Sequence, residues 1–314
     1  MKYFVTGGAG FIGSNMVDAL LESQDSEAVV FDNFASGKLS HVEHHLKDRR
    51  FRLIEGDLLD LPKLKSAIAG SDFVFHFAAN ADIAKSMIET DLDLRLGVIA
   101  TYNVMEAMRL NGIRQVAYSS GSGVYGDVGL TQTTEDFGPL LPISMYGASK
   151  LGAEGLISAF CHMFDMQSWV FRFANVVGRR QTHGVGFDFI RKLRNDHTRL
   201  EILGDGNQSK SYIHIGDVLT AILFVIRRSQ DAVNVFNVAT DDYITVNDIA
   251  EVVIDEMGLG GVEIVHAGGK RGWKGDVPVV RFDLTKAHAL GWKAKRSSAE
   301  AIRLSIKELL GELD

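Results

Sequence analysis

The stretch Lys2-Tyr3-Phe4-Val5-Thr6-Gly7-Gly8-Ala9-Gly10-Phe11-Ile12-Gly13 decides the fold of this chain. Residues 2–6 form a short apolar run that predicts a β-strand, and a glycine turn follows it and opens a helix over 11–23. Glycine at these positions permits a tight turn, a close approach of backbone N–H groups to a pyrophosphate, and tight packing of helix on strand. The phosphates would lie at the positive end of the helix dipole.

An acidic residue after the second strand fits the same motif. Asp32 ends a strand predicted over 28–32. A glycine turn with a strand before it, a helix after it and an acid at the end of the next strand is the context of a dinucleotide site. A carboxylate there accepts a ribose 2′-hydroxyl and repels a 2′-phosphate, so the sequence favours NAD over NADP.

Composition excludes several classes of protein. The 314 residues are 46% hydrophobic and 23% charged, which is typical of one large or two modest globular domains. The net charge of −7 and the lack of a basic tract argue against a nucleic-acid partner. No uncharged stretch approaches the ~20 residues of a membrane span, and no signal peptide precedes the strand at residue 2. The single cysteine, Cys161, excludes an intrachain disulfide and suits a reducing compartment, so we expect a cytoplasmic protein.

The order of elements predicts the fold class. Strands are predicted over 51–55, 72–77, 114–119 and 168–173, and helices over 39–45, 61–69, 85–110 and 145–164. Such alternation predicts a doubly wound parallel sheet of Rossmann-like α/β type. Beyond about residue 178, helices over 185–196, 215–228, 246–257 and 299–310 are separated by short strands and glycine-rich loops. We therefore expect an NAD-binding Rossmann domain over 1–177 and a smaller α/β substrate lobe over 178–314, with chain crossings between the two allowed.

A second motif carries the chemistry. Tyr146 and Lys150 are four residues apart on a predicted helix, so they lie on one face of it. A lysine ammonium there favours the phenolate and lowers the tyrosine pKa from its usual ~10. A phenolate can remove a proton from a sugar or alcohol hydroxyl while hydride leaves the same carbon. Alone, the pattern is that of an ordinary solvated helix pair, but here it follows a dinucleotide motif.

Together these motifs resemble the extended short-chain dehydrogenase/reductases, and within them the UDP-glucose/UDP-galactose 4-epimerases of archaeal type. The resemblance spans nearly the whole chain. It also rests on Asp32-Asn33, Gly56-Asp57-Leu58, His76-Phe77-Ala78-Ala79, Val124-Tyr125-Gly126, the run from Arg172 to Gly178, Leu203-Gly204-Asp205-Gly206, Ser211-Tyr212-Ile213-His214 and Gly275-Asp276-Val277.

The resemblance implies epimerisation of a UDP-sugar at C4 through a transient 4-keto intermediate, in a homodimer formed through helices over 99–110 and 145–160. Tyr146 and Lys150 would act on the sugar, and Asp57 and Leu58 would hold the adenine. The implied cofactor residues are Gly7, Gly10, Phe11, Ile12, Gly13, Asp32, Asn33, Ser36, Gly37, Asp57, Leu58, Phe77, Ala78, Ala79, Ser119, Tyr146 and Lys150. The implied substrate residues are Asn175, Leu203, Tyr212, Arg271 and Asp276, although Asn175 could instead cap a loop, Tyr212 could pack in the core and Arg271 could be a solvated loop charge.

Four positions depart from the family pattern. Gly121 stands where the family has a catalytic serine or threonine, and we expect Ser122 to replace that hydroxyl in part, because glycines on both sides allow a positive φ. Gly97 replaces an asparagine of the central helix. Lys210 replaces an arginine, which keeps a charge but loses a bidentate fork. Arg271 lies two residues farther from Gly275 than is commonest.

Missing acids separate the reactions of the family. The related sugar dehydratases place Asp-Glu where this chain has Ser122-Gly123, and the decarboxylases place a glutamate at Gly123. Simple epimerisation is therefore favoured. The alternatives are epimerisation at another carbon, a dehydratase, a reductase, or a weakly active NAD-binding regulatory homologue. No metal site is expected, because His41, His44 and His45 show no ligand pattern and are interpreted as surface residues.

Overall fold

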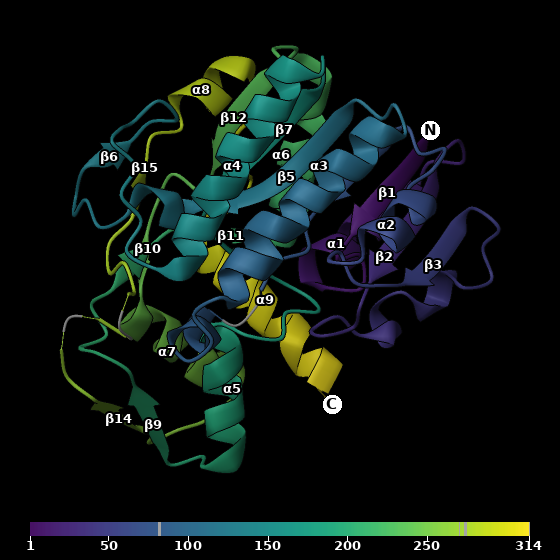
Figure 1. Ribbon diagram of the computed structural model, residues 1–314. Helices are drawn as coiled ribbons and strands as arrows, with labels where there is room; N and C mark the ends of the chain where they lie inside the picture. Colours follow the sequence, from purple (N-terminus) through teal and green to yellow (C-terminus); the bar gives the residue numbers. More distant parts are fainter. Residues whose placement is uncertain (81–82, 270, 273–274, 314) are drawn as a thin grey trace. The chain divides into compact units, whose positions relative to one another are not determined.

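A seven-stranded sheet is the largest sheet among the described residues (Figure 1), and its strand order is β12-β7-β5-β4-β1-β2-β3. The structure is a computed structural model and describes residues 1–80, 83–269, 271–272 and 275–313. The strands of the sheet are β1 (Lys2–Thr6), β2 (Glu27–Asp32), β3 (Phe51–Glu55), β4 (Phe73–His76), β5 (Gln115–Gly121), β7 (Gln167–Phe173) and β12 (Val233–Val238). The ladders β1–β2, β2–β3, β1–β4 and β4–β5 are parallel, which confirms the predicted Rossmann-like α/β class.

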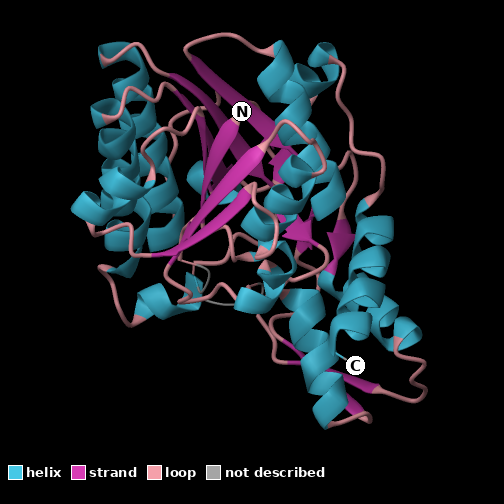
Figure 2. Ribbon diagram, turned by 90° about the vertical axis from the view of Figure 1, so that its right-hand side faces the viewer, coloured by secondary structure: helices cyan, strands magenta, loops and turns pink. Residues whose placement is uncertain are grey.

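Helices cover both faces of this sheet (Figure 2). They include α1 (Phe11–Leu21), α2 (Leu61–Ala67), α3 (Ala100–Leu110) and α4 (Met145–Met163). Helix α3 packs against α2 on one side and α4 on the other. Phe4, Val74 and Val116 are fully buried between the layers, as strands covered on both faces require.

Two predicted helices are interrupted. The run predicted as one helix over 85–110 is a 3-10 turn η3 (Ile83–Met87), a π-helical turn η4 (Leu94–Ile99) and then α3. Gly97 explains the close packing here: a Cβ added to it would lie 2.6 Å from Ser149 Oγ on α4. The segment predicted as a helix over 39–45 consists of two 3-10 turns, η1 (Leu39–His41) and η2 (Glu43–His45).

The chain divides into two compact units by its internal contacts. The first unit contains Met1–Val124, Met145–Arg172 and Ile222–Phe236, and the second contains Tyr125–Ser144, Phe173–Ala221 and Asn237–Asp314. Helix α6 (Ile215–Arg228) contributes to both. The functional boundary between residues 177 and 178 stays a prediction.

Helices and short strand pairs build the second unit. Its helices are α5 (Val185–Asn195), α7 (Val246–Glu256), α8 (Thr285–Leu290) and α9 (Ser298–Leu313). Its strand pairs are β11 (Tyr212–His214) with β8 (Asn175–Val177), β10 (Ser209–Lys210) with β13 (Ile244–Thr245), β14 (Glu263–His266) with β9 (Arg199–Ile202), and β15 (Arg281–Phe282) with β6 (Gln132–Thr133). Its core includes Ile190, Ile249 and Ile302, from α5, α7 and α9. Within the described residues, every helix is too short or too polar to cross a membrane.

Candidate active site

The glycine turn after β1 is shaped by main-chain contacts that only glycine allows. Gly7 has φ +66°, and a Cβ added to it would lie 2.8 Å from the main chain of Ala78. A Cβ added to Gly13 would lie 2.2 Å from the carbonyl oxygen of Gly7. Gly10 is the N-cap of α1, offers no side-chain cap, and no acidic residue follows in the first turn. The backbone N–H groups at this helix end therefore fit an anionic pyrophosphate.

Asp32 lies beside this turn. Its Oδ2 accepts a hydrogen bond from the Ala9 N–H at 2.9 Å, and its Oδ1 accepts one from the Phe34 N–H at 2.8 Å. Burial raises the pKa of Asp32, and these two main-chain bonds oppose the rise. A Cβ added to Gly37 would lie 2.9 Å from Asp32 Oδ1, so Gly37 also keeps the approach to the carboxylate open. The exposed Ser36 lies next to it in the same loop.

The predicted adenine residues Asp57 and Leu58 follow β3, and the predicted cofactor residue Asn33 follows β2. Asn33 donates from Nδ2 to Asp57 Oδ2 at 3.3 Å. Asp57 also accepts a bond from the Leu59 N–H at 2.9 Å. Leu58 is buried, and its carbonyl accepts a bond from Asn103 Nδ2 at 2.8 Å. The structure thus brings Asn33 and Asn103 to the adjacent residues Asp57 and Leu58, from which both are far apart in the sequence.

His76, the last residue of β4, belongs to a buried chain of hydrogen bonds that fixes the start of the segment Phe77-Ala78-Ala79. His76 Nδ1 lies 2.7 Å from Thr6 Oγ1, and His76 Nε2 lies 3.0 Å from Thr101 Oγ1. The Thr101 hydroxyl donates to the Gly97 carbonyl, so the His76 Nε2–H donates to Thr101. Burial, assisted by the charge of Lys150, lowers the pKa of His76 to about 3. His76 is therefore a neutral, structural histidine with a single tautomer.

Tyr146 and Lys150 lie on one face of α4, as predicted. Lys150 donates from Nζ to the Ser119 carbonyl at 2.6 Å, and its Nζ lies 5.5 Å from the centroid of the Tyr146 ring. The predicted lowering of the tyrosine pKa is wrong for this arrangement. Burial, with the charge of Asp93, raises the pKa of Tyr146 to about 12, and burial lowers the pKa of Lys150 to about 8. Burial disfavours both charged forms, and the ammonium is directed at a carbonyl rather than at the phenol.

Asp93 is a site residue that sequence reasoning missed. It is buried at the start of η4 and accepts bonds from Asn80 Nδ2 at 3.1 Å and from Ser86 Oγ at 2.5 Å. It therefore ties the segment after β4 to the helix beside Tyr146. The sequence predicted a continuous helix over 85–110, in which a carboxylate is usually solvated, and so offered no reason to place Asp93 in the site.

The Glu154–Arg172 ion pair was also missed. Arg172 donates from Nη2 to Glu154 Oε2 at 2.7 Å, and Ser120 Oγ donates to Glu154 Oε1 at 2.5 Å. All three residues are buried. The pair joins α4 to β5 and β7, which fixes the helix that carries Tyr146. The only sequence signal for this pair was that Glu154 lies four residues after Lys150, which places both side chains on the same face of α4.

The turn after β5 holds Ser122. Gly121 ends β5, and Ser122 begins a 3-10 turn η5 (Ser122–Tyr125). The expected positive φ is wrong, because neither Gly121 nor Gly123 adopts one. Glycine at Gly123 has a different reason: a Cβ there would lie 3.3 Å from Gly147 Cα, next to Tyr146 on α4. Among the described residues, none forms a hydrogen bond with the Ser122 hydroxyl, so the turn does not use it.

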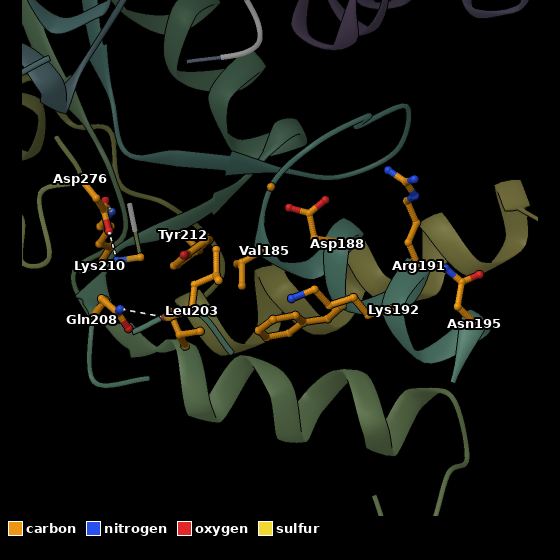
Figure 3. A pocket seen from close by; sticks show the side chains of 14 residues that line it. Val185, Asp188, Arg191, Lys192, Asn195, Leu203, Gln208, Lys210, Tyr212 and Asp276 are labelled. Carbon is orange, nitrogen blue, oxygen red and sulfur yellow. Dashed lines mark hydrogen bonds and ion pairs between the residues drawn. The ribbon is translucent and has the colours of Figure 1, made fainter. Parts of the chain in front are cut away.

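The second unit contains a cavity of about 540 Å³ (Figure 3). Three of the predicted substrate residues line it, namely Leu203, Tyr212 and Asp276. Its other lining residues are Gly184, Val185, Asp188, Phe189, Arg191, Lys192, Asn195, Gln208, Lys210, Val246 and Gly272. Apolar side chains with a few cations and acids are the usual lining of a small-molecule site.

Polar groups in this cavity are placed by short contacts. Lys210 and Asp276 form an ion pair at 2.7 Å. Burial and the charge of Asp276 raise the pKa of Tyr212, so its phenol stays protonated. Gln208 donates from Nε2 to the Leu203 carbonyl at 3.1 Å, while its buried Oε1 has no partner among the described residues. Gln208 was missed by sequence reasoning, and its unused oxygen can accept a hydrogen bond from a ligand.

Two predicted substrate residues do not line the cavity. Asn175 donates from Nδ2 to the Ser211 carbonyl at 3.4 Å, which holds β8 against β11. Arg271 is exposed and donates from Nη2 to Asp127 Oδ2 at 2.6 Å. An arginine so engaged must exchange this partner before it can hold a phosphate.

Comparisons with known proteins agree with this geometry. The profile of the "NAD dependent epimerase/dehydratase family" matches residues 3–239. A solved UDP-galactose 4-epimerase is 38% identical, with a TM-score of 0.88 and 100% of each chain covered. The UDP-glucose 4-epimerase of Mycolicibacterium smegmatis is 30% identical over 98% of each chain. A dTDP-glucose 4,6-dehydratase of Mycobacterium tuberculosis is 31% identical over 73% of this chain and 70% of its own length.

Proposed function

The chain belongs to the NAD dependent epimerase/dehydratase family, and we propose that it epimerises a UDP-sugar at C4, of the UDP-glucose/UDP-galactose type. The observation that carries the proposal is the contact between Gly123 and Gly147 beside Tyr146. A Cβ at Gly123 would lie 3.3 Å from Gly147 Cα, so the turn packs closely on α4 beside Tyr146, and Gly123, as a glycine, supplies no acidic side chain there. Elimination of water requires a proton donor or acceptor that these residues do not supply, whereas oxidation and reduction at one carbon require only a single base.

NAD is the cofactor of this family, and the turn around Gly7, Gly10 and Gly13 fits its pyrophosphate. Asp32 would accept the ribose hydroxyls, and Asn33, Asp57 and Leu58 would surround the adenine. The remaining predicted cofactor residues would contact other parts of NAD. When bound, NAD supplies a hydride acceptor that returns the hydride within one catalytic cycle.

Tyr146 is the proposed base. Its phenolate oxygen would take the proton of the sugar C4 hydroxyl, and the resulting hydroxyl would return it after the 4-keto sugar has turned over in the site. Lys150 would support the phenolate when its ammonium is charged, and the unused hydroxyl of Ser122 would be a second partner for the C4 oxygen. A phenol with a pKa near 12 is almost wholly protonated at neutral pH, so the positive charge of oxidised NAD, when bound, would favour its ionisation.

The cavity of the second unit is the proposed site for the UDP group. Leu203 and Tyr212 offer surfaces to a nucleoside, and Gln208 Oε1 can accept a bond from a base N–H. Lys210, with Arg191 and Lys192, supplies positive charge for the diphosphate. Asp276 would orient Lys210 through their ion pair, while Asn175 and Arg271 stay predictions as direct substrate ligands.

The experiment is incubation of the purified chain with UDP-glucose, with the product identified by NMR. The proposal predicts UDP-galactose at equilibrium, without net NADH formation and without loss of water from the sugar. A 4-keto-6-deoxy product would identify a dehydratase, and stoichiometric NADH consumption in a parallel reaction supplied with NADH would identify a reductase. UDP-N-acetylglucosamine and UDP-glucuronate in parallel reactions identify the sugar series, and Tyr146→Phe is the inactive control.

The proposal includes a homodimer formed through α3 and α4. Large apolar side chains are exposed on η4 and these helices, with Tyr102 44%, Met145 52% and Met163 72% exposed. Phe160 and Phe164, near the end of α4, pack against one another, and Tyr102 on α3 contacts Phe160. A charged substitution such as Tyr102→Asp should give monomers in light scattering if this surface forms the dimer.

A further inference from the structure

Three side chains that the proposed reaction does not use meet beside the NAD-binding part of the first unit. Asp18 projects from α1, and His44 and His45 belong to the turn η2. His45 Nε2 lies 2.8 Å from Asp18 Oδ1, and His44 Nε2 lies 3.0 Å from the same oxygen. One ligand atom from each residue lies within 4.8 Å of the other two. From this juxtaposition we propose a binding site for a divalent transition-metal ion of the zinc type.

The scaffold holds these side chains in place. The ring of His45 packs on that of buried Phe51 in β3, with centroids 5.5 Å apart. Arg50 donates to the carbonyls of Leu21 and Ser23, at 3.1 Å and 2.8 Å, which ties the loop after η2 to the end of α1. The arrangement therefore does not depend on the two histidine contacts alone, and the ligand atoms are preorganised.

The donor set selects the class of cation. Two imidazole nitrogens and one carboxylate oxygen suit Zn²⁺, Co²⁺ and Ni²⁺, whereas Mg²⁺ and Ca²⁺ prefer oxygen ligands only. Zinc bonds of ~2.0–2.2 Å separate neighbouring ligand atoms by roughly 3.3 Å in a tetrahedron. The nitrogen–oxygen distances of 2.8 Å and 3.0 Å would have to open only by a few tenths of an ångström to admit such an ion. Water would complete the coordination.

The competing interpretation is a simple pair of hydrogen bonds. In that case each imidazole donates an Nε2–H to Asp18, and no cation is needed. The two interpretations differ in a measurable way, because a metal must displace the Nε2 protons and binds more tightly as pH rises. They also differ in the effect of Zn²⁺ on stability.

The location gives the ion a structural role. Helix α1 follows the glycine turn, and η1 and η2 follow the loop that contains Asp32 and Gly37. The main chain of Lys38 and the ring of His41 both donate to the Ala9 carbonyl, at 3.0 Å and 2.9 Å. An ion held by Asp18, His44 and His45 would therefore fasten the loop behind Asp32 to the helix that begins at the pyrophosphate turn.

The test uses the full-length chain without an affinity tag, treated with EDTA and then freed of it. Zn²⁺ is titrated by calorimetry, and Co²⁺ is titrated by visible absorption, which is intense for four-coordinate cobalt. The variants are Asp18→Asn, His44→Gln and His45→Gln. The control is His197→Gln, because His197 is an exposed histidine of the second unit.

The proposal predicts one Zn²⁺ per chain for the wild type and for His197→Gln. Each site variant should bind at least ~10-fold more weakly. Zn²⁺, but not Mg²⁺, should raise the Tm of the wild type and leave the Tm of the variants unchanged. Equal binding by wild type and site variants, or no saturable binding by the wild type, overturns it.

A folding defect in a variant can be distinguished from a loss of metal binding. Circular dichroism and Tm without metal identify any variant that is not folded, and His44→Gln is the mildest, since the His44 side chain is 46% exposed. The wild-type Co²⁺ spectrum and its loss on lowering the pH test the site without any substitution.

Discussion

Lys150 donates a 2.6 Å hydrogen bond from Nζ to the main-chain carbonyl of Ser119, at the end of β5. The bond joins the helix that carries Tyr146 to the strand that leads to Ser122. It also keeps the ammonium 5.5 Å from the Tyr146 ring centroid rather than on the phenol oxygen. The proposed proton-transfer groups are therefore positioned by a bond to a main-chain oxygen, and substitution of the Ser119 side chain would not remove this acceptor.

Tyr146→Phe should abolish turnover and leave the fold and NAD binding intact, because it removes only the hydroxyl that carries the proton. The loss of one general acid–base group is typically ~10²–10⁴-fold in rate. Product formation by NMR, NAD affinity by calorimetry and circular dichroism give the three measurements. Near-native turnover would mean that the base has been misidentified.

Lys150→Ala should move the rising limb of the kcat–pH profile to higher pH. The proposed reaction needs the Tyr146 phenolate, and below about pH 8 the Lys150 side chain is a charged ammonium that favours this anion, so its removal leaves less phenolate at a given pH. The profile of the wild type should level off before that of the variant. Coincident profiles would assign Lys150 a purely structural role.

The Asp32 carboxylate should make the chain prefer NAD to NADP. Both of its oxygens already accept main-chain bonds, so the side chain cannot turn away from a 2′-phosphate. Calorimetry with the two cofactors measures the preference, and Asp32→Asn should reduce it. Equal or tighter binding of NADP by the wild type contradicts the assignment.

Ser122→Ala should lower kcat at least ~10-fold if its hydroxyl contacts the C4 oxygen. Adding Gly121→Ser to that variant should restore part of the rate, because it returns a hydroxyl to the position that the family uses. KM should change little in either variant. An unchanged kcat in Ser122→Ala would leave Tyr146 or a water molecule to move the proton alone.

His76 should make stability fall in acid. Its pKa is about 3 in the folded chain and ~6.5 when unfolded, so the unfolded chain binds more protons between these values. Its contribution is therefore fully present above pH ~6.5 and is lost as the pH falls, by roughly 2 kcal/mol at pH ~5. Urea unfolding at both pH values should show this extra loss in the wild type relative to His76→Gln.

An NMR titration of the wild type checks the same point without a variant. The His76 ring should stay neutral down to about pH 4. Protonation near pH ~6.5, as for an exposed histidine, would contradict the buried hydrogen-bond chain.

The fold could be predicted from the sequence because its signals are local. The glycine turn, Asp32 and the pair Tyr146 and Lys150 each follow from spacing along one strand or helix. The groups that were missed depend on contacts between distant segments. Asp93 meets Tyr146 only because η4 packs on α4 at Gly97, and Gln208 matters only because its oxygen is buried in a cavity.

Electrostatics was the least predictable property. The sequence places Lys150 one helical turn from Tyr146, which suggests a lowered tyrosine pKa. It does not show that burial opposes the phenolate or that the Ser119 carbonyl attracts the ammonium. His41 was interpreted as a surface residue because it shows no metal-ligand pattern, yet it is buried and its Nδ1–H donates to the Ala9 carbonyl.

The discontinuous make-up of the two units limits how relatives of this chain can be recombined. Strand β12 lies at the edge of the seven-stranded sheet but comes from residues 233–238. A hybrid that joins the first 177 residues of this chain to the remainder of a relative would carry a foreign edge strand beside β7. A transfer of substrate preference that leaves the sheet intact therefore requires several segments to be replaced together. Helix α6 and strand β12 should come from the parent that supplies the rest of the sheet.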